Sequence, residues 1–361
     1  MTRVPHPIKP HAALTYKEPM SVRMGRWMLL GGSILLVLAL LYVVAWLITS
    51  MSLRSGIQDW VEAKRAEGYL ITYAGKKADI GGFPLRVEAT LNDMKFAPPA
   101  VKGKKRNWVW SAKRVGFSMI PVPWEISMVT VDLSADQTLK VGNSLLAGQA
   151  EKFQLAVNWL SEGIPDNTSL MIDKWQLQGG GLGLNVRKLA LSTQRQEKGD
   201  YGLALRGEAI DLPLAITGLG RRISDVTLHA KMTKNFGIDG LKQTALGRWR
   251  DAGGTLEVER MQLSYPPLTL QGNGTLALDG ALQPVGAFSA RIQGFFQTVS
   301  ALRRAGVIRG PDASMAKVVL GMLAKQPKNG GPATISLPLT IQERALFAGP
   351  VRLIHLPQID W

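Results

Sequence analysis

The chain has 361 residues, 46% of them hydrophobic, and its 43 Lys and Arg against 27 Asp and Glu give a net charge of +16. Such a composition folds, which excludes a disordered or collagen-like chain. The absence of cysteine excludes disulfides, so any part outside the cytoplasm must be stabilised by packing alone.

The first element in chain order is an apolar segment near the amino terminus. Between Trp27 and Leu53 lie 27 consecutive uncharged residues. As a helix they would reach about 40 Å, more than the roughly 30 Å hydrocarbon core of a bilayer. A buried core helix is disfavoured by this length. A cleavable signal peptide is disfavoured because Trp46-Leu47-Ile48 stand where small residues are required. We therefore predict an uncleaved transmembrane helix over residues 27–50.

Charge predicts the orientation of this helix. The preceding tail carries one acid, Glu18, against five basic residues, Arg3, Lys9, Lys17, Arg23 and Arg26. Basic residues are retained on the cytoplasmic side, so the tail 1–26 is expected there. The rest would lie outside the inner membrane, in the periplasm of a Gram-negative bacterium. Trp27 at one end, and Tyr42 with Trp46 at the other, suit the lipid–water boundary.

A second helical pattern follows the apolar segment directly. Leu53, Ile57, Trp60 and Val61 recur at helical spacing, and Gly68 supplies a stop. We predict an amphipathic stem over residues 51–68 that lays its apolar side on the body or on the membrane surface.

From Tyr69 the period of the hydrophobic pattern changes to two. In "ADIGGFPLRVEAT", Phe83, Leu85 and Val87 alternate with polar residues or proline, as in a strand with one wet face. Gly81-Gly82 would form a turn before it, and a proline near the start of a strand favours an edge position. We predict an early strand at a sheet edge.

Further alternating runs separated by short turns follow along the chain. They are Ile126–Leu133, Phe153–Trp159, Leu170–Leu177, Leu182–Ser192, Tyr201–Ile210, Ile223–Met232, Thr255–Ser264, Leu268–Leu278 and Val285–Ile292. Brief connections favour antiparallel pairing. One helical pair interrupts them at about 295–325, with Met315, Val318, Val319, Met322 and Leu323 expected to face inward.

The predicted fold is thus α+β and mostly antiparallel. A curved β-rich body over residues 69–361 follows the membrane helix and stem and contains a C-terminal helical hairpin insertion. Two loosely similar lobes are one reading of the body, because about 310 residues suffice for two cores.

No catalytic, cofactor-binding or metal-binding residue is predicted, and the chain is not expected to be an enzyme. Only His229 and His355 lie outside the tail, without a second histidine at metal-ligand spacing. Gly272 to Ala277 match a dinucleotide-binding pattern, but a strand and a turn follow instead of the required helix.

The segment "KGKKRNWVW" combines basic and aromatic residues: Lys102, Lys104, Lys105, Arg106, Trp108 and Trp110. Nucleic acid would suit this chemistry, but it is excluded as a partner by the predicted topology. Contact with anionic lipid headgroups is one reading. A solvated loop followed by two core tryptophans is the other.

Taken together, "GGFPLRVEA", "GNGTLALDGALQP" and "ISLPLTIQERALFAGPVRLIHLP" resemble the uncharacterised proteobacterial envelope family called domain of unknown function 2125. The resemblance covers residues 50–359 and implies an inner-membrane protein with a periplasmic body and no assigned activity. More remotely, the glycine-spaced strands are similar to those of AsmA-type envelope proteins, which implies a curved sheet that holds lipid tails.

Two functions are argued at this point; a third, a cell-envelope hydrolase, would need a polar cleft with perturbed carboxylates. In the first, the body binds or passes a lipidic ligand on an apolar sheet face; the candidate groove residues are Phe83, Leu85, Val87, Leu268, Leu270, Leu276 and Leu278. Each of these residues would also suit an ordinary core. In the second, the protein is an envelope scaffold or assembly factor, and the strand after Pro84 offers an edge to another protein.

Overall fold

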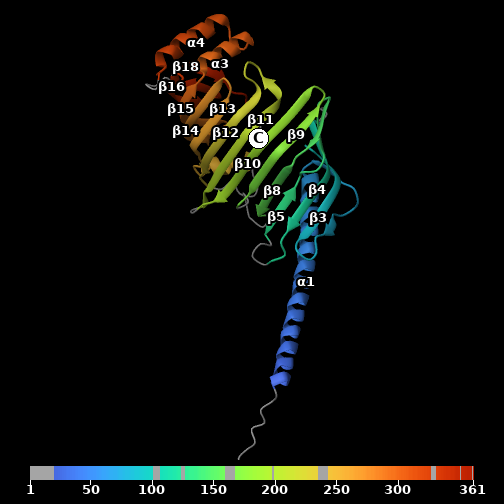
Figure 1. Cartoon of the computed structure of the whole chain (residues 1–361). Coiled ribbons are helices and arrows are strands. Elements are labelled where there is room, and N and C mark those ends of the chain that lie inside the picture. The colour runs from blue at the N-terminus through green and yellow to red at the C-terminus, as the bar shows by residue number, and fades with distance from the viewer. Residues whose placement is uncertain are drawn as a thin grey trace, which may run out of the picture.

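A computed structural model describes residues 20–100, 106–122, 127–158, 167–196, 199–234, 243–326, 331–349, 351–359 and 361. It begins with helix α1, Met20–Ala66, which continues without a break from the apolar segment into the stem. Within the described residues, α1 is the one helix long and apolar enough to cross a membrane, and only 11% of its most apolar window is buried. This stretch is therefore not a core helix of the body, and it extends well beyond the sheet (Figure 1).

The stem packs its apolar side on the body, which is one of the two placements that the sequence left open. Leu53, Ile57 and Val61 are each at most 6% exposed and belong to the same buried cluster as residues of the first strands. Thr49 and Ser50, one turn earlier, are buried as well. The helix that carries the apolar segment is thus also part of the folded core.

The body is a single antiparallel sheet of 18 strands in the described residues. The strands are β1 Leu70–Thr72, β2 Asp79–Gly81, β3 Val87–Ala97, β4 Trp108–Met119, β5 Met128–Asp132, β6 Gln137–Val141, β7 Ser144–Gln149, β8 Lys152–Asn158, β9 Ser169–Gly179, β10 Leu182–Arg195, β11 Tyr201–Ile216, β12 Gly220–Met232, β13 Leu256–Tyr265, β14 Leu268–Leu278, β15 Pro284–Gln293, β16 Thr334–Gln342, β17 Ala345–Ala348 and β18 Val351–His355.

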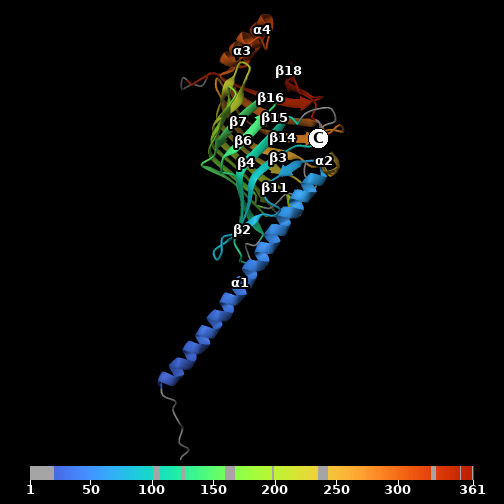
Figure 2. The same ribbon diagram turned by 90° about the vertical axis from the view of Figure 1, so that its right-hand side faces the viewer.

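The order of the strands is almost that of the chain. From β9 to β18 each strand pairs with its predecessor. Before β9 the order branches, because β4 pairs with both β5 and β6, and the pairs β5–β8 and β6–β7 both lead to β9. The predicted antiparallel, curved body is confirmed, and both of its halves belong to one sheet (Figures 1 and 2).

The early strand predicted from Phe83 onward is wrong at its start and in its edge position. Residues 83–85 form a turn and β3 begins only at Val87. Strand β3 pairs with β4 on one side and with β1 and β2 on the other, so it is not an edge. The alternation was misleading because the chain turns at Gly82, where φ is +89°, and takes the direction of the strand only after the turn.

Gly82→Val is therefore expected to destabilise the body. A Cβ at residue 82 would lie 2.6 Å from the carbonyl oxygen of Arg86, in a backbone conformation that valine avoids. We expect a loss of about 2–3 kcal/mol in the free energy of unfolding, measured by thermal unfolding of the full chain in detergent. Gly81→Ala is the neighbouring control, because a Cβ there meets nothing within 4 Å. Equal melting temperatures for both variants would contradict this account.

Three further helices complete the described structure: α2 Gln243–Asp251, α3 Phe295–Arg304 and α4 Gly310–Leu323. Helix α2 was not predicted; its Trp249 packs on Tyr201 and Met232. The pair α3–α4 was predicted and lies at the end of the body opposite the free end of α1 (Figures 1 and 2). The inward orientation expected for α4 is wrong, since Met322 is 73% exposed and Met315, Val318, Val319 and Leu323 are exposed as well.

Candidate functional site

One row of apolar residues crosses the sheet on a single face. Directly opposite residues of paired antiparallel strands share a face, so the register defines the row. We call it the central apolar row: Ala89, Phe117, Val131, Leu155, Leu170, Leu191, Leu205, Leu228, Met261, Gly272, Ala290 and Leu337. With about 4.8 Å between strands, it runs for roughly 50 Å along the sheet.

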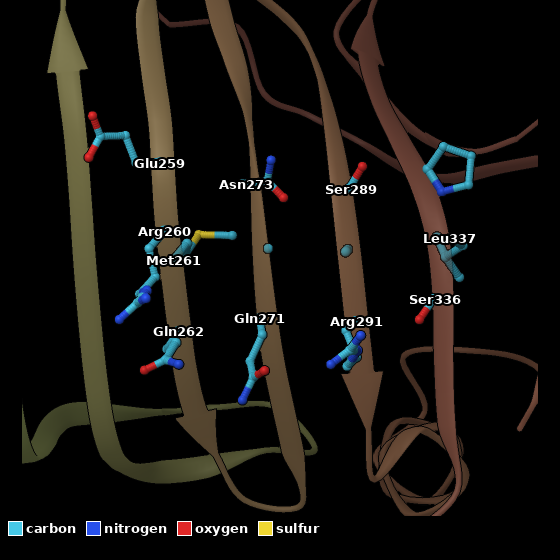
Figure 3. Close-up of a pocket in the computed structure, with 13 residues that line it drawn as sticks. Glu259, Arg260, Met261, Gln262, Gln271, Asn273, Ser289, Arg291, Ser336 and Leu337 are labelled. Carbon is cyan, nitrogen blue, oxygen red and sulfur yellow. The ribbon is translucent and has the colours of Figure 1, made fainter. Parts of the chain in front are cut away.

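The neighbouring row on the opposite face is mostly polar. It consists of Thr90, Gly116, Asp132, Gln154, Met171, Ala190, Arg206, Thr227, Gln262, Gln271, Arg291 and Ser336. Figure 3 shows Gln262, Gln271 and Arg291 side by side on neighbouring strands. They help to line a hollow of about 540 Å³. This face is suited to water, so the apolar face is the one that needs a cover.

The apolar face is covered at Ala290 and Ile335, on β15 and β16, and most extensively beneath the stem. There Val87 and Ala89 are fully buried and Val115 is 2% exposed. Farther along the row, Leu191, Leu205, Leu228, Met261 and Leu337 are only half-buried. The described helices reach only the margins of this region: α2 packs near the ends of β11 and β12, α3 contacts β14, and α4 contacts β16.

An apolar cavity of about 580 Å³ lies where the stem meets the row. The stem contributes Leu53, Gly56, Ile57 and Trp60, and the sheet contributes Met94, Phe96, Trp110, Val115, Phe117, Val129, Val131, Leu133, Leu155 and Val157. None of these side chains is charged. The volume lies in the range of about 300–1,000 Å³ that is typical of small-molecule sites.

The cavity opens onto the central apolar row through shared residues. Phe117, Val131 and Leu155 line the cavity and are members of the row. The next row member, Leu170 on β9, pairs with Leu155. An apolar chain that entered beside the stem would therefore find apolar contacts strand after strand.

One buried polar group on this face has no partner among the described residues. The indole Nε1 of Trp175 on β9 is buried and makes no hydrogen bond within that part of the chain. The Trp175 ring packs edge-on against Phe153, with 5.1 Å between centroids, and its register partner Val186 is buried. A buried N–H without an acceptor is unfavourable, so this group is suited to donate to an oxygen of a ligand.

The predicted groove residues fall into two separate groups. Leu268, Leu270, Leu276 and Leu278 lie half-buried on the apolar face of β14. Phe83 and Leu85 lie in the turn before β3, beside α1, and are 57% and 82% exposed. Val87 is fully buried. The structure does not bring the two groups together.

The predicted membrane-surface segment is described only in part. Lys102, Lys104 and Lys105 lie outside the described residues. Arg106 Nε donates to the carbonyl oxygen of Pro98 at 2.9 Å, and the Trp108 ring is 5.9 Å from that of Phe96. Trp110 lines the apolar cavity, and its indole donates to Gln137 Oε1 at 3.0 Å.

Displaced pKa values occur on the polar side of the sheet, each with a structural cause. The bidentate hydrogen bonds from Arg222, both 2.7 Å, lower the pKa of Asp211. The hydrogen bond from Lys231 lowers the pKa of Asp200. Burial alone would raise the pKa of Asp132, but hydrogen bonds from Ser134 hold it below its usual value.

Within the described residues, no group of three or more metal-ligating side chains is present.

Most of the cavity residues were missed from the sequence. The alternation of "MVTVD" and "KFQLAVN" indicated which residues share a face. It did not indicate that β5 pairs with β8, because β6 and β7 lie between them in the sequence. Only this pairing places Val129, Val131 and Leu155 around one space with the stem. No pattern in the sequence around Trp175 indicated that its indole would be buried without a hydrogen-bond acceptor.

A family model described as "Uncharacterized protein conserved in bacteria (DUF2125)" matches residues 46–357, which covers most of the chain. The match includes the end of α1, the cavity and the whole central apolar row. The search of curated proteins found no match, and neither did the search of solved structures.

Proposed function

Because the chain belongs to the uncharacterised bacterial family DUF2125, we propose its function from geometry: it binds a lipidic molecule on the apolar face of its sheet and guides it along the central apolar row. The observation that carries this proposal is the continuity of the row with the cavity beneath the stem. A half-buried apolar surface of this extent is unfavourable in water. Acyl chains would cover it without needing any polar partner.

The proposal includes the membrane in which the protein stands. Residues 27–50 of α1 span the inner membrane of a diderm bacterium, with residues 1–26 in the cytoplasm and the body in the periplasm. Support comes from the excess of basic residues before the helix and from its exposed apolar surface. The buried Thr49, Ser50 and Leu53 support an uncleaved anchor, because removing this helix would expose part of the core.

Trp175 supplies the polar contact in this proposal. Its unpartnered Nε1 would donate to an ester or phosphate oxygen of the bound lipid. The ligand class is therefore an amphiphile with acyl chains and at least one oxygen acceptor near them.

Native mass spectrometry of the full chain released from detergent micelles tests the proposal. We expect adducts with the mass of phospholipids or fatty acids that survive detergent exchange. A protein that is consistently free of lipid, and that retains a stoichiometric protein partner, would contradict it and favour a scaffold function.

Trp175→Phe is expected to weaken binding of a labelled phosphatidylethanolamine by about 2- to 10-fold, as for the loss of one hydrogen bond. An aromatic ring that can pack on Phe153 is retained, and the smaller phenyl ring should lower the melting temperature only slightly. The control is Trp361→Phe, which loses an indole hydrogen bond to Leu282 elsewhere. Unchanged affinity in Trp175→Phe would rule out the assigned contact.

A further inference from the structure

The turn between β2 and β3 is fixed to the apolar part of α1. Trp46 Nε1 donates to the carbonyl oxygen of Arg86 at 3.0 Å, and the Tyr42 hydroxyl donates to the carbonyl oxygen of Pro84. The Trp46 and Phe83 rings meet edge to face, with 5.3 Å between their centroids. These contacts hold the turn, residues 82–86, against one side of the helix.

The turn descends along the helix toward its amino terminus. Its contacts pass from Arg86 at Trp46 to Pro84 at Tyr42, which is four residues earlier in α1. At 1.5 Å per residue, the tip lies about 6 Å closer to the membrane centre than its base. The base carries an ion pair between Arg86 and Glu88 at 2.5 Å. The tip, Pro84, lies between Leu85 and Phe83, and the Phe83 ring reaches back to Trp46.

The polarity of the turn matches this direction. Phe83 and Leu85 are 57% and 82% exposed, and the surrounding helix is exposed and apolar at Leu38 and Leu41. Single exposed apolar residues are ordinary. Here Phe83 and Leu85 continue the apolar surface of α1, and the ion pair of Arg86 and Glu88 lies on the side toward the body.

The length of α1 places the turn at a membrane boundary. From Trp27 to Trp46 the helix rises by about 28 Å, close to the roughly 30 Å hydrocarbon core. Tyr42 and Trp46 then lie at the outer lipid–water boundary, which their rings prefer. The tip would sit at the depth of about 5–10 Å typical of interfacial elements.

We propose that the turn 82–86 inserts Phe83 and Leu85 into the outer leaflet of the membrane that α1 spans. This rests on the proposed anchorage. The insertion would fix how far the cavity lies above the membrane. Leu53, the first stem residue that lines the cavity, lies seven residues, or about 10 Å, beyond Trp46 along the helix. Lipid from the outer leaflet would thus have a short path to the cavity.

Site-directed spin labelling tests the insertion, since the chain has no cysteine of its own. Three exposed leucines give matched positions: Leu85→Cys in the turn, Leu38→Cys on α1, and Leu214→Cys near the end of β11. Each full-length variant is labelled in phosphatidylethanolamine–phosphatidylglycerol vesicles. The access of each label to oxygen and to a water-soluble nickel complex is then compared.

We expect the labels at residues 38 and 85 to lose access to nickel and the label at 214 to keep it. A label at 85 that behaves like 214 while 38 stays in lipid would overturn the insertion and leave the anchor standing. A label at 38 that is open to nickel would overturn both.

Discussion

Leu155→Glu is expected to reduce the lipid retained by the purified protein at least tenfold. Leu155 lines the cavity, belongs to the central apolar row and is half-buried. A carboxylate at this position must lose water when an acyl chain covers it, and the cost of burying an unpaired charge far exceeds the about 1.4 kcal/mol that a tenfold effect requires. The measurement is quantitative lipid extraction from the full chain after detergent exchange.

The control for this change is the preceding residue on the same strand. Gln154→Glu introduces the same carboxylate on the opposite, polar face. It replaces the hydrogen bond from Gln154 to Asp132 with two opposed carboxylates, so its melting temperature is measured as well. It should retain the lipid of the parent. If Leu155→Glu lowers the melting temperature more than Gln154→Glu does, Leu155→Trp is used in place of Leu155→Glu. The tryptophan narrows the cavity and keeps the face apolar. Parental lipid content in a folded Leu155→Trp protein would count against the cavity.

Gly274→Val is expected to unfold the body at a markedly lower temperature. Gly274 lies on the apolar face of β14, where a Cβ would come 2.3 Å from the carbonyl oxygen of Ala287 and 2.5 Å from the ring of Phe288. Backbone of β15 cannot move aside without breaking the ladder. We expect a loss of about 3 kcal/mol or more, and a fall in melting temperature on the order of 5–10 °C.

Gly280→Ala serves as the control for Gly274→Val. It lies in the turn after β14, and a Cβ there meets nothing within 4 Å. The measurement for both is circular dichroism against temperature on the full chain in detergent. A melting temperature for Gly274→Val within the error of the control would show that β14 and β15 do not approach as closely as described.

Local hydrophobic patterns in the sequence predicted many of the strands and helices. Strands such as β14 were predicted from strict alternation, since Leu268, Leu270, Leu276 and Leu278 share one face. The α3–α4 pair was predicted from its helical spacing. These signals depend only on neighbours in sequence, which is why they hold without knowledge of the pairing.

Features set by distant contacts could not be predicted in the same way. Helix α2 is only nine residues long and is stabilised by the packing of Trp249 against β11 and β12. The apolar residues of α4 were placed inward because a core was assumed around them, whereas the α3–α4 pair lies at one end of the sheet (Figure 1). The central apolar row needs the register of twelve strands, and that register is not encoded in any one of them.

Photo-crosslinking from the apolar face tests the central claim most directly. The amino acid p-benzoyl-phenylalanine is placed at Leu205, in the middle of the row, or at Arg206, the next residue on the polar face. After illumination of membranes, we expect a lipid mass attached at residue 205 and none at 206. A protein crosslink at 205, or no adduct at either residue, would contradict lipid binding on this face.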